Sequence, residues 1–372
     1  MEDPGKTPSH VVPLAPPSLW PTLQRLAGGA WPPKDGPTAT RFVEAAVQQG
    51  LLPLLLNEEA CPPAVAAARE RYRVWDQLFR RRAENLLGAM QALAKLLGPE
   101  PFILLKGADY AWRLYPDPVL RPMQDIDILV PTRQFASVCA RLRAAGLVQR
   151  FEGASTHRVA WFGESVFDLG EVTLEVHHSF LPRARHPIDY DAVWERRVPV
   201  ALSGVVAARL DDVDAFVYHA LSLAKDEFFV RLARYLDFWL LLRTVPSLDP
   251  ACLRAREWRA THALYGALRQ AQDLFPEMEE RLARPTAGLL PGRTRRFLER
   301  FVLPGAEGLR ITRRRRRGLQ LWRKFWLMDS GWRRTCFALH YGYAMGRGWW
   351  LTWRARATPE GPGRPGPGTN TA

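Results

Sequence analysis

The chain of 372 residues contains little cysteine and no long uncharged apolar run. Its cysteines lie far apart, and no pair has the spacing of a zinc site. They are Cys61, Cys139, Cys252 and Cys336. We expect reduced thiols in ordinary buried or half-buried positions, as in an intracellular protein.

Two further absences concern membranes and secretion. A membrane-spanning helix needs about 20 apolar residues in a row. The best candidate, residues 236–242, is short and contains Asp237. The residues after Met1 are acidic and lack an apolar signal core. We therefore predict a cytoplasmic protein with no transmembrane segment.

Acidic residues are fewer than basic ones. Asp and Glu total 38 against 52 Lys and Arg, which gives a formal net charge of +14. A positive protein attracts anions such as nucleotides or nucleic acids. The net charge is therefore compatible with a nucleotide or a nucleic acid as partner, but it does not identify either.

Composition and periodicity predict an α+β protein in four parts. Residues 1–38 and 358–372 are rich in Pro and Gly and are expected to be disordered tails. We expect a catalytic domain over residues 39–210, with N-terminal helices and a small mixed β-sheet. Residues 211–357 form an expected α-helical domain with a basic, Trp-rich end.

The expected helices of the first half cover residues 40–56 and 62–97, with Val74 and Leu78 among the inward positions of the second. Strands are expected over residues 102–105, 126–130, 147–151, 157–162 and 172–177, with a hairpin over 199–210 that turns at Gly204. The second half begins at Asp212 as an N-cap, and its helices cover residues 213–224, 231–242 and 250–274.

The most informative motif is Asp125-Ile126-Asp127, which lies within Leu120–Val130. Side chains alternate on a strand, so both aspartates project from one face while Ile126 and Ile128 enter a core. Like charges this close are costly unless a cation lies between them. Oxygen ligands on a rigid strand suit Mg²⁺ or Mn²⁺.

A second motif precedes it. Residues 102–105 are apolar, and Lys106-Gly107 follows them at the start of an expected helix. A strand, a glycine turn and a helix N-terminus together offer free backbone N–H groups to a phosphate. Lys106 is either a phosphate contact or a plain surface lysine at the strand end.

A third motif is the alternating run Val172–His177, which places Glu175 and His177 on one face of a strand. Glu175 supplies a third carboxylate. Three acids beside a phosphate-binding turn are the arrangement of metal-assisted phosphoryl or nucleotidyl transfer. A lone strand histidine such as His177 is more often a hydrogen-bonded structural residue than a catalytic one.

These motifs together resemble the bacterial nucleotidyltransferase-like family of the DNA polymerase β-type nucleotidyltransferase superfamily. The resemblance rests on Leu105-Lys106-Gly107, Arg121–Val130, Glu175-Val176-His177 and the helical segment Tyr218–Asp237. One departure is that the superfamily's turn carries Gly-Ser or Gly-Gly, whereas this chain has Lys106-Gly107.

The resemblance implies an enzyme that moves a nucleoside monophosphate from an NTP, expected to be ATP, to an unidentified hydroxyl-type acceptor. Asp125, Asp127 and Glu175 are then the catalytic and metal-binding residues, with Mg²⁺ or Mn²⁺. The alternative is a catalytically silent member of the fold that binds a nucleotide or a partner.

Lys106, Gly107 and Arg121 are the expected nucleotide-binding residues. Arg121 has three open interpretations: a pair with a site carboxylate, a phosphate contact, or a salt bridge within its loop. Asp237 lies in an apolar helix. We expect its partner to be a buried donor such as Arg234 or one at the sheet edge, or else the side chain shapes the site.

The last distinctive segment begins at Arg313–Arg317. Beyond it Leu321, Phe325, Met328 and Trp332 form an apolar stripe at helical spacing. Such a basic amphipathic segment binds an anionic surface or partner in some proteins. We favour the other interpretation, in which the stripe packs on the domain and the arginines face solvent.

Overall fold

The structure of the protein is a computed structural model. It describes residues 16–59, 61–98, 100–150, 163–181, 185–202, 204–304, 317–339 and 342–343.

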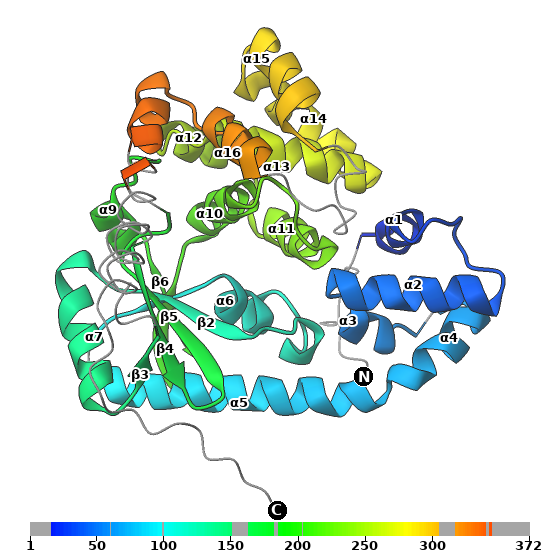
Figure 1. Ribbon diagram of the computed structural model, residues 1–372, viewed down its shortest axis with the longest axis horizontal. Coiled ribbons are helices and arrows are strands. Elements are labelled where there is room, and N and C mark those ends of the chain that lie inside the picture. The colour runs from blue at the N-terminus through cyan, green and yellow to red at the C-terminus, as the bar shows by residue number, and fades with distance from the viewer. Residues whose placement is uncertain are drawn as a thin grey trace, which may run out of the picture.

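The centre of the described fold is one seven-stranded mixed sheet (Figure 1). Its strand order is β3-β4-β5-β2-β1-β7-β6. β2 pairs with β5, and β1 with β7, in parallel, while the other neighbours are antiparallel. The strands are β1 (Ile103–Leu105), β2 (Asp125–Leu129), β3 (Val148–Gln149), β4 (Glu164–Leu169), β5 (Val172–His177), β6 (Val198–Leu202) and β7 (Val205–Arg209).

The N-terminal helices precede the sheet and continue into α5, which runs under it (Figure 1). They are α1 (Leu19–Leu26), α2 (Gly36–Gln49), α3 (Leu52–Leu56), α4 (Pro63–Arg69), the 3₁₀ turn η1 (Glu70–Tyr72) and α5 (Val74–Leu97). Between strands lie α6 (Lys106–Arg113), η2 (Pro118–Leu120), η3 (Thr132–Gln134), α7 (Phe135–Ala144) and α9 (Tyr190–Glu195).

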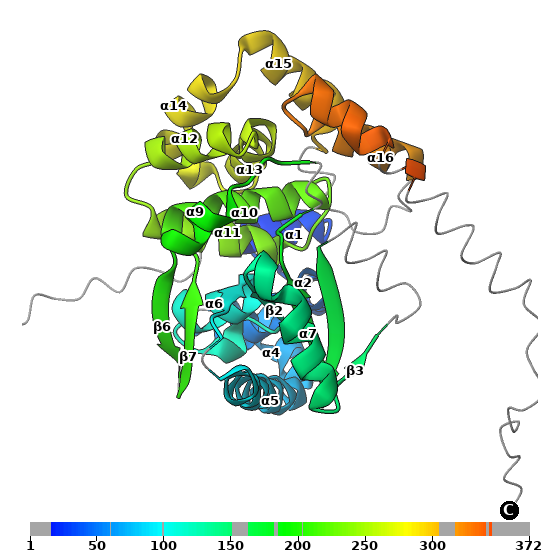
Figure 2. The same cartoon turned by 90° about the vertical axis from the view of Figure 1, so that its left-hand side faces the viewer.

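The helical half lies above the opposite face of the sheet, as Figure 2 shows from the side. Its helices are α10 (Asp212–Lys225), α11 (Leu232–Thr244), α12 (Asp249–Glu257), α13 (Thr261–Leu274), η4 (Pro276–Met278), α14 (Glu279–Leu289), α15 (Gly292–Phe297), the π-helical turn η5 (Leu298–Val302) and α16 (Arg317–Trp326). Residues 331–339 are also helical.

Each face of the sheet has its own core. Ile126 and Ile128 of β2 pack with Leu86 and Met90 of α5 in one buried cluster. The helices above the sheet form the other cluster, in which Phe216 and Phe238 stack with ring centroids 4.6 Å apart. Because alternate residues of β2 point to opposite faces, the apolar side fixes which way the acidic side points.

The α+β class predicted from the sequence is confirmed, and so are several elements. β5 has the predicted bounds, and β6 and β7 form the predicted hairpin. Gly204, with φ +87°, provides the left-handed backbone of its turn. Cys139 and Cys252 are buried, and all four thiols are free, as expected. Within the described residues, no helix is long and apolar enough to span a membrane.

Several predicted elements differ from the structure. Helix α1 lies inside the expected N-terminal tail because Leu19 and Leu23 are buried against the core. The expected helix 40–56 is split at Gly50, whose φ of +73° ends α2. The expected helix 250–274 is split near Arg259, whose φ is +49°. Strand β4 was not predicted, and the predicted strand 157–162 lies outside the described residues.

Two errors concern single positions. The N-cap of α10 is Asp211, whose side chain accepts from the Asp214 N–H, rather than Asp212. Val74 and Leu78, predicted to face inward, are 69% and 52% exposed, because the first half of α5 extends beyond the sheet. In the C-terminal stripe Met328 is buried but Trp332 is 73% exposed.

Candidate active site

The paired aspartates lie on β2, where the strand passes between β1 and β5. Asp127 is buried and Asp125 is half-buried. Burial raises the pKa of Asp125 to about 6, and the negative charges of Asp127 and Glu175 add to the shift. The strand therefore presents two acids in unlike environments.

Glu175 joins them through the strand register. In the parallel β2–β5 ladder, Asp127 is the Cα partner of Glu175, and Asp125 is the partner of Thr173. Partnered residues of neighbouring strands project from the same face. The predicted meeting of Asp127 and Glu175 on one face is therefore what the structure shows.

His177 belongs to the same cluster. Its Nε2 lies 2.9 Å from Asp127 Oδ1, to which it donates, and 3.5 Å from Glu175 Oε2. Burial opposes the imidazolium, but the hydrogen bonds to Asp127 and Glu175 raise the pKa of His177 above its ordinary value. The histidine is hydrogen-bonded, as the sequence favoured, and its partner is a site carboxylate.

Lys106 faces the same carboxylate from the turn between β1 and α6. Its Nζ donates to Asp127 Oδ1 at 3.0 Å. Burial opposes the ammonium, but Asp127 raises the pKa of Lys106 well above its usual value. Lys106 and His177 together hold the pKa of Asp127 well below its usual range, against the effect of burial. The Lys106 backbone has φ +43°, a left-handed conformation that is strained for a residue with a side chain and is typical of functional turns.

Gly107 leaves the turn open to Arg121. A Cβ at this position would lie 2.7 Å from Arg121 Nη1 and 3.0 Å from Met123 Sδ. Any larger residue would push the guanidinium away, so the missing side chain has a steric reason here. Arg121 and Met123 thus occupy the space beside Gly107, and phosphate binding at this turn stays a prediction.

Arg121 forms a buried pair that connects the two halves of the molecule. Its Nε donates to Asp237 Oδ1 at 2.9 Å and its Nη2 donates to Oδ2 at 2.7 Å. The Tyr115 hydroxyl also donates to Oδ1 at 2.9 Å. Asp237 thus has buried donors, as predicted, but Arg234 is not among them, because Arg234 donates to Asp226 at 2.7 Å. Of the three interpretations of Arg121, the observed contact is an ion pair, and it reaches across to α11.

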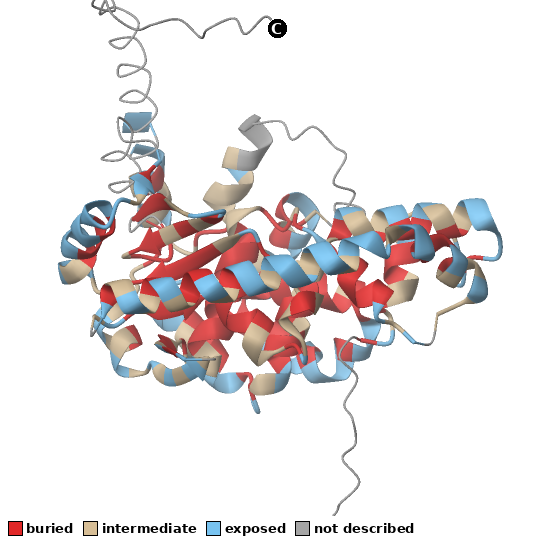
Figure 3. Cartoon of the chain, turned by 90° about the horizontal axis from the view of Figure 1, so that it is seen from below, coloured by how far each residue is buried: buried red, intermediate tan, exposed pale blue. Residues whose placement is uncertain are grey.

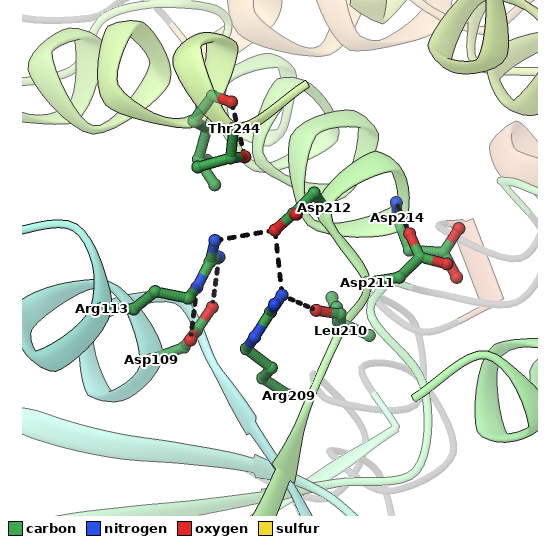
Figure 4. Close-up of polar contacts among 9 residues, drawn as sticks. Asp109, Arg113, Arg209, Leu210, Asp211, Asp212, Asp214 and Thr244 are labelled. Atoms are coloured by element: carbon green, nitrogen blue, oxygen red, sulfur yellow. Dashed lines mark hydrogen bonds and ion pairs between the residues drawn. The ribbon is translucent and has the colours of Figure 1, made fainter. Parts of the chain in front are cut away.

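A second polar network holds the helix that follows the turn. Figure 4 shows Arg113 between Asp109 of α6 and Asp212 of α10. Arg113 donates to Asp109 at 2.9 and 2.7 Å and to Asp212 at 3.0 Å, and Arg209 donates to Asp212 at 2.9 Å. These contacts fix α6, and so its first residues Lys106 and Gly107, to the start of the helical half.

A cavity of about 450 Å³ lies between these elements. The β1–α6 turn, the start of β2 and the loop between α10 and α11 line it, and both Asp125 and Asp127 face it. Its lining also includes Lys225 and Arg231, which form no ion pair with any described residue. Burial and the nearby Lys106 lower the pKa of Lys225. No sequence pattern selects these two cations, because only the folded α10–α11 loop brings them to the cavity.

The cluster suits a divalent cation. Asp127, Glu175 and His177 each offer one ligand atom, and these atoms lie within 4.8 Å of one another. Carboxylate oxygens suit Mg²⁺, and a mixed set with an imidazole nitrogen also suits Mn²⁺. Asp125, predicted as a ligand, lies outside this group of three atoms. After burial, the negative charges of Asp127 and Glu175 contribute to its raised pKa.

The fold and these acids define a nucleotidyltransferase-like protein. The chain belongs to the family described as uncharacterised nucleotidyltransferase, whose model matches residues 35–276. No curated protein matches the chain. Among solved structures, an antigenic nucleotidyltransferase-like protein from Paracoccidioides brasiliensis is similar over 54% of this chain and 94% of its own. That similarity is 16% in sequence identity, with a TM-score of 0.37.

Proposed function

We propose that the protein transfers a nucleoside monophosphate from an NTP, with ATP as the expected donor, to a hydroxyl-type acceptor, and releases pyrophosphate. Membership in the nucleotidyltransferase family supports this reaction class. The observation that carries the proposal is the register of β2 and β5, which sets Asp127 opposite Glu175 beside the Lys106-Gly107 turn.

In this proposal Asp125, Asp127 and Glu175 are the metal-binding and catalytic carboxylates, and His177 supports them. A bound Mg²⁺ or Mn²⁺ would neutralise charge on the phosphates and the attacking oxygen. The protein's own part is to position the reactants and balance their charge, which supplies most of the catalysis in phosphoryl transfer.

The cationic side of the cavity is suited to the triphosphate. Lys225 and Arg231 have no acidic partner among the described residues, and Arg121 directs Nη1 toward Gly107. The acceptor oxygen forms a bond to the α-phosphorus while the bond from that phosphorus to the pyrophosphate oxygen breaks. Glu175 takes the proton of the acceptor hydroxyl, because it is the most exposed of the three clustered groups.

The test has two parts. Each α-labelled NTP is incubated with the protein, Mn²⁺ and a cell extract, and the labelled product is identified. We expect labelling with the wild type and none with Asp127→Asn. Asp168→Asn is the matched control, because Asp168 lies on the same sheet in β4 but pairs with Arg150 away from the cavity. Labelling that survives in Asp127→Asn would refute the proposed active site.

A silent, nucleotide-binding member is the second candidate, and one contact favours it. The Lys106 ammonium already neutralises Asp127, as a cation would. Melting curves with ATP, with and without Mg²⁺, separate the two candidates. An enzyme should show a metal-dependent stabilisation by ATP, whereas a silent member should show stabilisation that is equal without metal.

A further inference from the structure

A second groove lies beside the candidate active site, on the α5 face of the sheet. It has a volume of about 330 Å³. Leu78, Arg81 and Arg82 of α5 line one side, and Gln124 and Val172 line the other. Figure 3, seen from below, shows α5 with its exposed positions turned outward along this face. None of these residues belongs to the metal cluster described above.

The register of the sheet places this groove next to the acids. Gln124 and Val172 directly precede Asp125 and Thr173, which are partners in the parallel β2–β5 ladder. Both strands therefore begin at the same end of the sheet, and the residue before each first strand residue lines the groove. Gln124 is exposed and lines the large cavity as well. The groove lies on the α5 face and Asp125 projects from the other face, so a molecule in the groove reaches Asp125 by passing round the ends of the strands at Gln124.

The groove carries two arginines that form no ion pair with any described residue. Arg81 and Arg82 are exposed and form no hydrogen bond or ion pair within the described chain. Their neighbour Arg80 differs, because it pairs with Asp76 at 3.0 Å and with Asp117 at 3.4 Å. Guanidinium groups with free donors suit bidentate contacts with carboxylate or phosphate.

One acid, Glu171, also lines the groove, but it is engaged. Its Oε2 accepts from Asn85 Nδ2 at 3.0 Å. Two arginines against one carboxylate still leave a net positive charge. The groove therefore favours an anionic ligand over a neutral or cationic one.

Exposed apolar side chains adjoin the arginines on α5. Leu78 is 52% exposed and lines the groove, and Trp75, one turn earlier, is 41% exposed. Residues three and four apart share a helix face, so Trp75, Leu78 and Arg82 form one continuous strip. An isolated anion would leave this apolar part of the strip uncovered.

We propose that this groove binds the acceptor, and that the acceptor carries a carboxylate or phosphate group next to an apolar group. Arg81 and Arg82 hold the anion, Leu78 and Trp75 contact the apolar part, and the reactive hydroxyl extends past Gln124 toward Asp125. This inference rests on the proposed function, because it names the acceptor side of that site.

The binding test uses phenyl phosphate as the probe and calorimetry as the measurement. Saturating α,β-methylene-ATP and Mg²⁺ keep the large cavity filled. We expect the wild type to bind phenyl phosphate, and Arg81→Gln/Arg82→Gln to bind it about tenfold more weakly or worse, since charge-assisted hydrogen bonds are lost. Lys95→Gln, which removes an exposed cation from the same helix outside the groove, should bind like the wild type.

A second arm separates the two parts of the ligand. Leu78→Ser should weaken phenyl phosphate but leave the binding of inorganic phosphate unchanged. Equal affinity of the double arginine variant and the wild type, or no binding by the wild type, overturns the proposal. So does a loss in Lys95→Gln as large as that in the arginine variant.

Failure of the groove and failure of the proposed function give different results. If the groove binds the acceptor, Arg81→Gln/Arg82→Gln should lose acceptor labelling but keep its stabilisation by the ATP analogue. Full labelling by this variant overturns the proposal that the groove binds the acceptor. Labelling that persists in Asp127→Asn overturns the proposed function, whatever the phenyl phosphate result.

Discussion

Lys106 and Asp127 are 21 positions apart in the sequence, and Nζ of the first donates to Oδ1 of the second at 3.0 Å. The contact joins the turn after β1 to the middle of β2. It stabilises the ionised form of Asp127, while Asp125, two residues earlier on the same face, has a raised pKa. The two aspartates of one motif therefore contribute to stability with opposite sign in the metal-free protein.

This difference predicts opposite effects of the same substitution. Asp127→Asn should lower metal-free stability by about 3 kcal/mol, because it leaves the Lys106 ammonium buried without its partner. The closeness of the two like charges, taken without the Lys106 contact, would favour a gain from relief of repulsion between the acids. Asp125→Asn should provide that gain, of about 1–3 kcal/mol at pH 8. Urea unfolding in chelator measures both.

The pH dependence of the Asp125 variant follows from its pKa. The folded pKa of about 6 lies above the ordinary value of 3.8 for an aspartate, so the ionised carboxyl costs stability at high pH. The advantage of Asp125→Asn should be complete above pH 6, shrink as the pH falls from 6 toward 4, and vanish below 4. A variant that is as destabilised as Asp127→Asn at pH 8 would show that Asp125 is structural.

Gly107→Ala should weaken nucleotide binding. The added Cβ meets Arg121 Nη1 at 2.7 Å, so either the guanidinium or the turn must move. Gly88→Ala in α5 is the matched control, because its Cβ would meet nothing within 4 Å. That substitution should stabilise the protein by roughly 0.5–1 kcal/mol through helix propensity and leave binding intact. Titration with a fluorescent ATP analogue compares them, and equal affinities would contradict the role assigned to Gly107.

Acid should destabilise the protein through buried histidines. Burial lowers the pKa of His219 to about 4, although Asp237 partly opposes this, and its ring lies 2.8 Å from the Arg234 carbonyl oxygen. Because the folded pKa is below the ordinary 6.5, stability is complete above pH 6.5 and falls as the pH drops toward 4. At pH 5 the loss from this residue is about 2 kcal/mol. In His219→Gln the melting temperature should fall less between pH 7 and pH 5 than in the wild type. An equal fall in both proteins would exclude this residue as the source.

The acidic half of the site was predictable because it depends on local alternation. Strand periodicity fixes the faces of Asp125, Asp127 and Glu175, and the apolar partners Ile126 and Ile128 determine which face is buried. The glycine turn was predictable because it is also a local feature: Lys106-Gly107 directly follows an apolar strand in the sequence.

The cationic half was not predictable, because its contacts are long-range. Arg121 meets Asp237 across 116 positions, and no periodicity connects them. Lys225 and Arg231 reach the cavity only through the packing of α10 and α11 above the sheet. The exposure of Leu78 was not predicted. The helical spacing of apolar residues predicts which face of α5 they share, but not how far along its length the helix packs against the sheet.

The C-terminal segment provides the last prediction, and its contacts favour a structural role. Asp329 caps α13 from outside that helix, since its carboxylate accepts from the Thr261 and His262 N–H groups at 2.8 and 2.9 Å. Lys324 Nζ lies 3.2 Å from the buried Glu227, and Met328 is fully buried. Deleting residues 311–372 should therefore expose apolar surface, leave α13 uncapped, and cause aggregation. Asp329→Ala alone should cost about 1–2 kcal/mol.

A shorter truncation after Tyr343 is the comparison, because it retains every described contact of the segment. The alternative is a surface that binds anionic membranes. Co-sedimentation with phosphatidylserine vesicles at low and high salt tests it, since screening weakens such binding. If the protein without residues 311–372 is monodisperse, binds nucleotide and has lost only its vesicle binding, the segment serves a membrane and the packing interpretation is wrong.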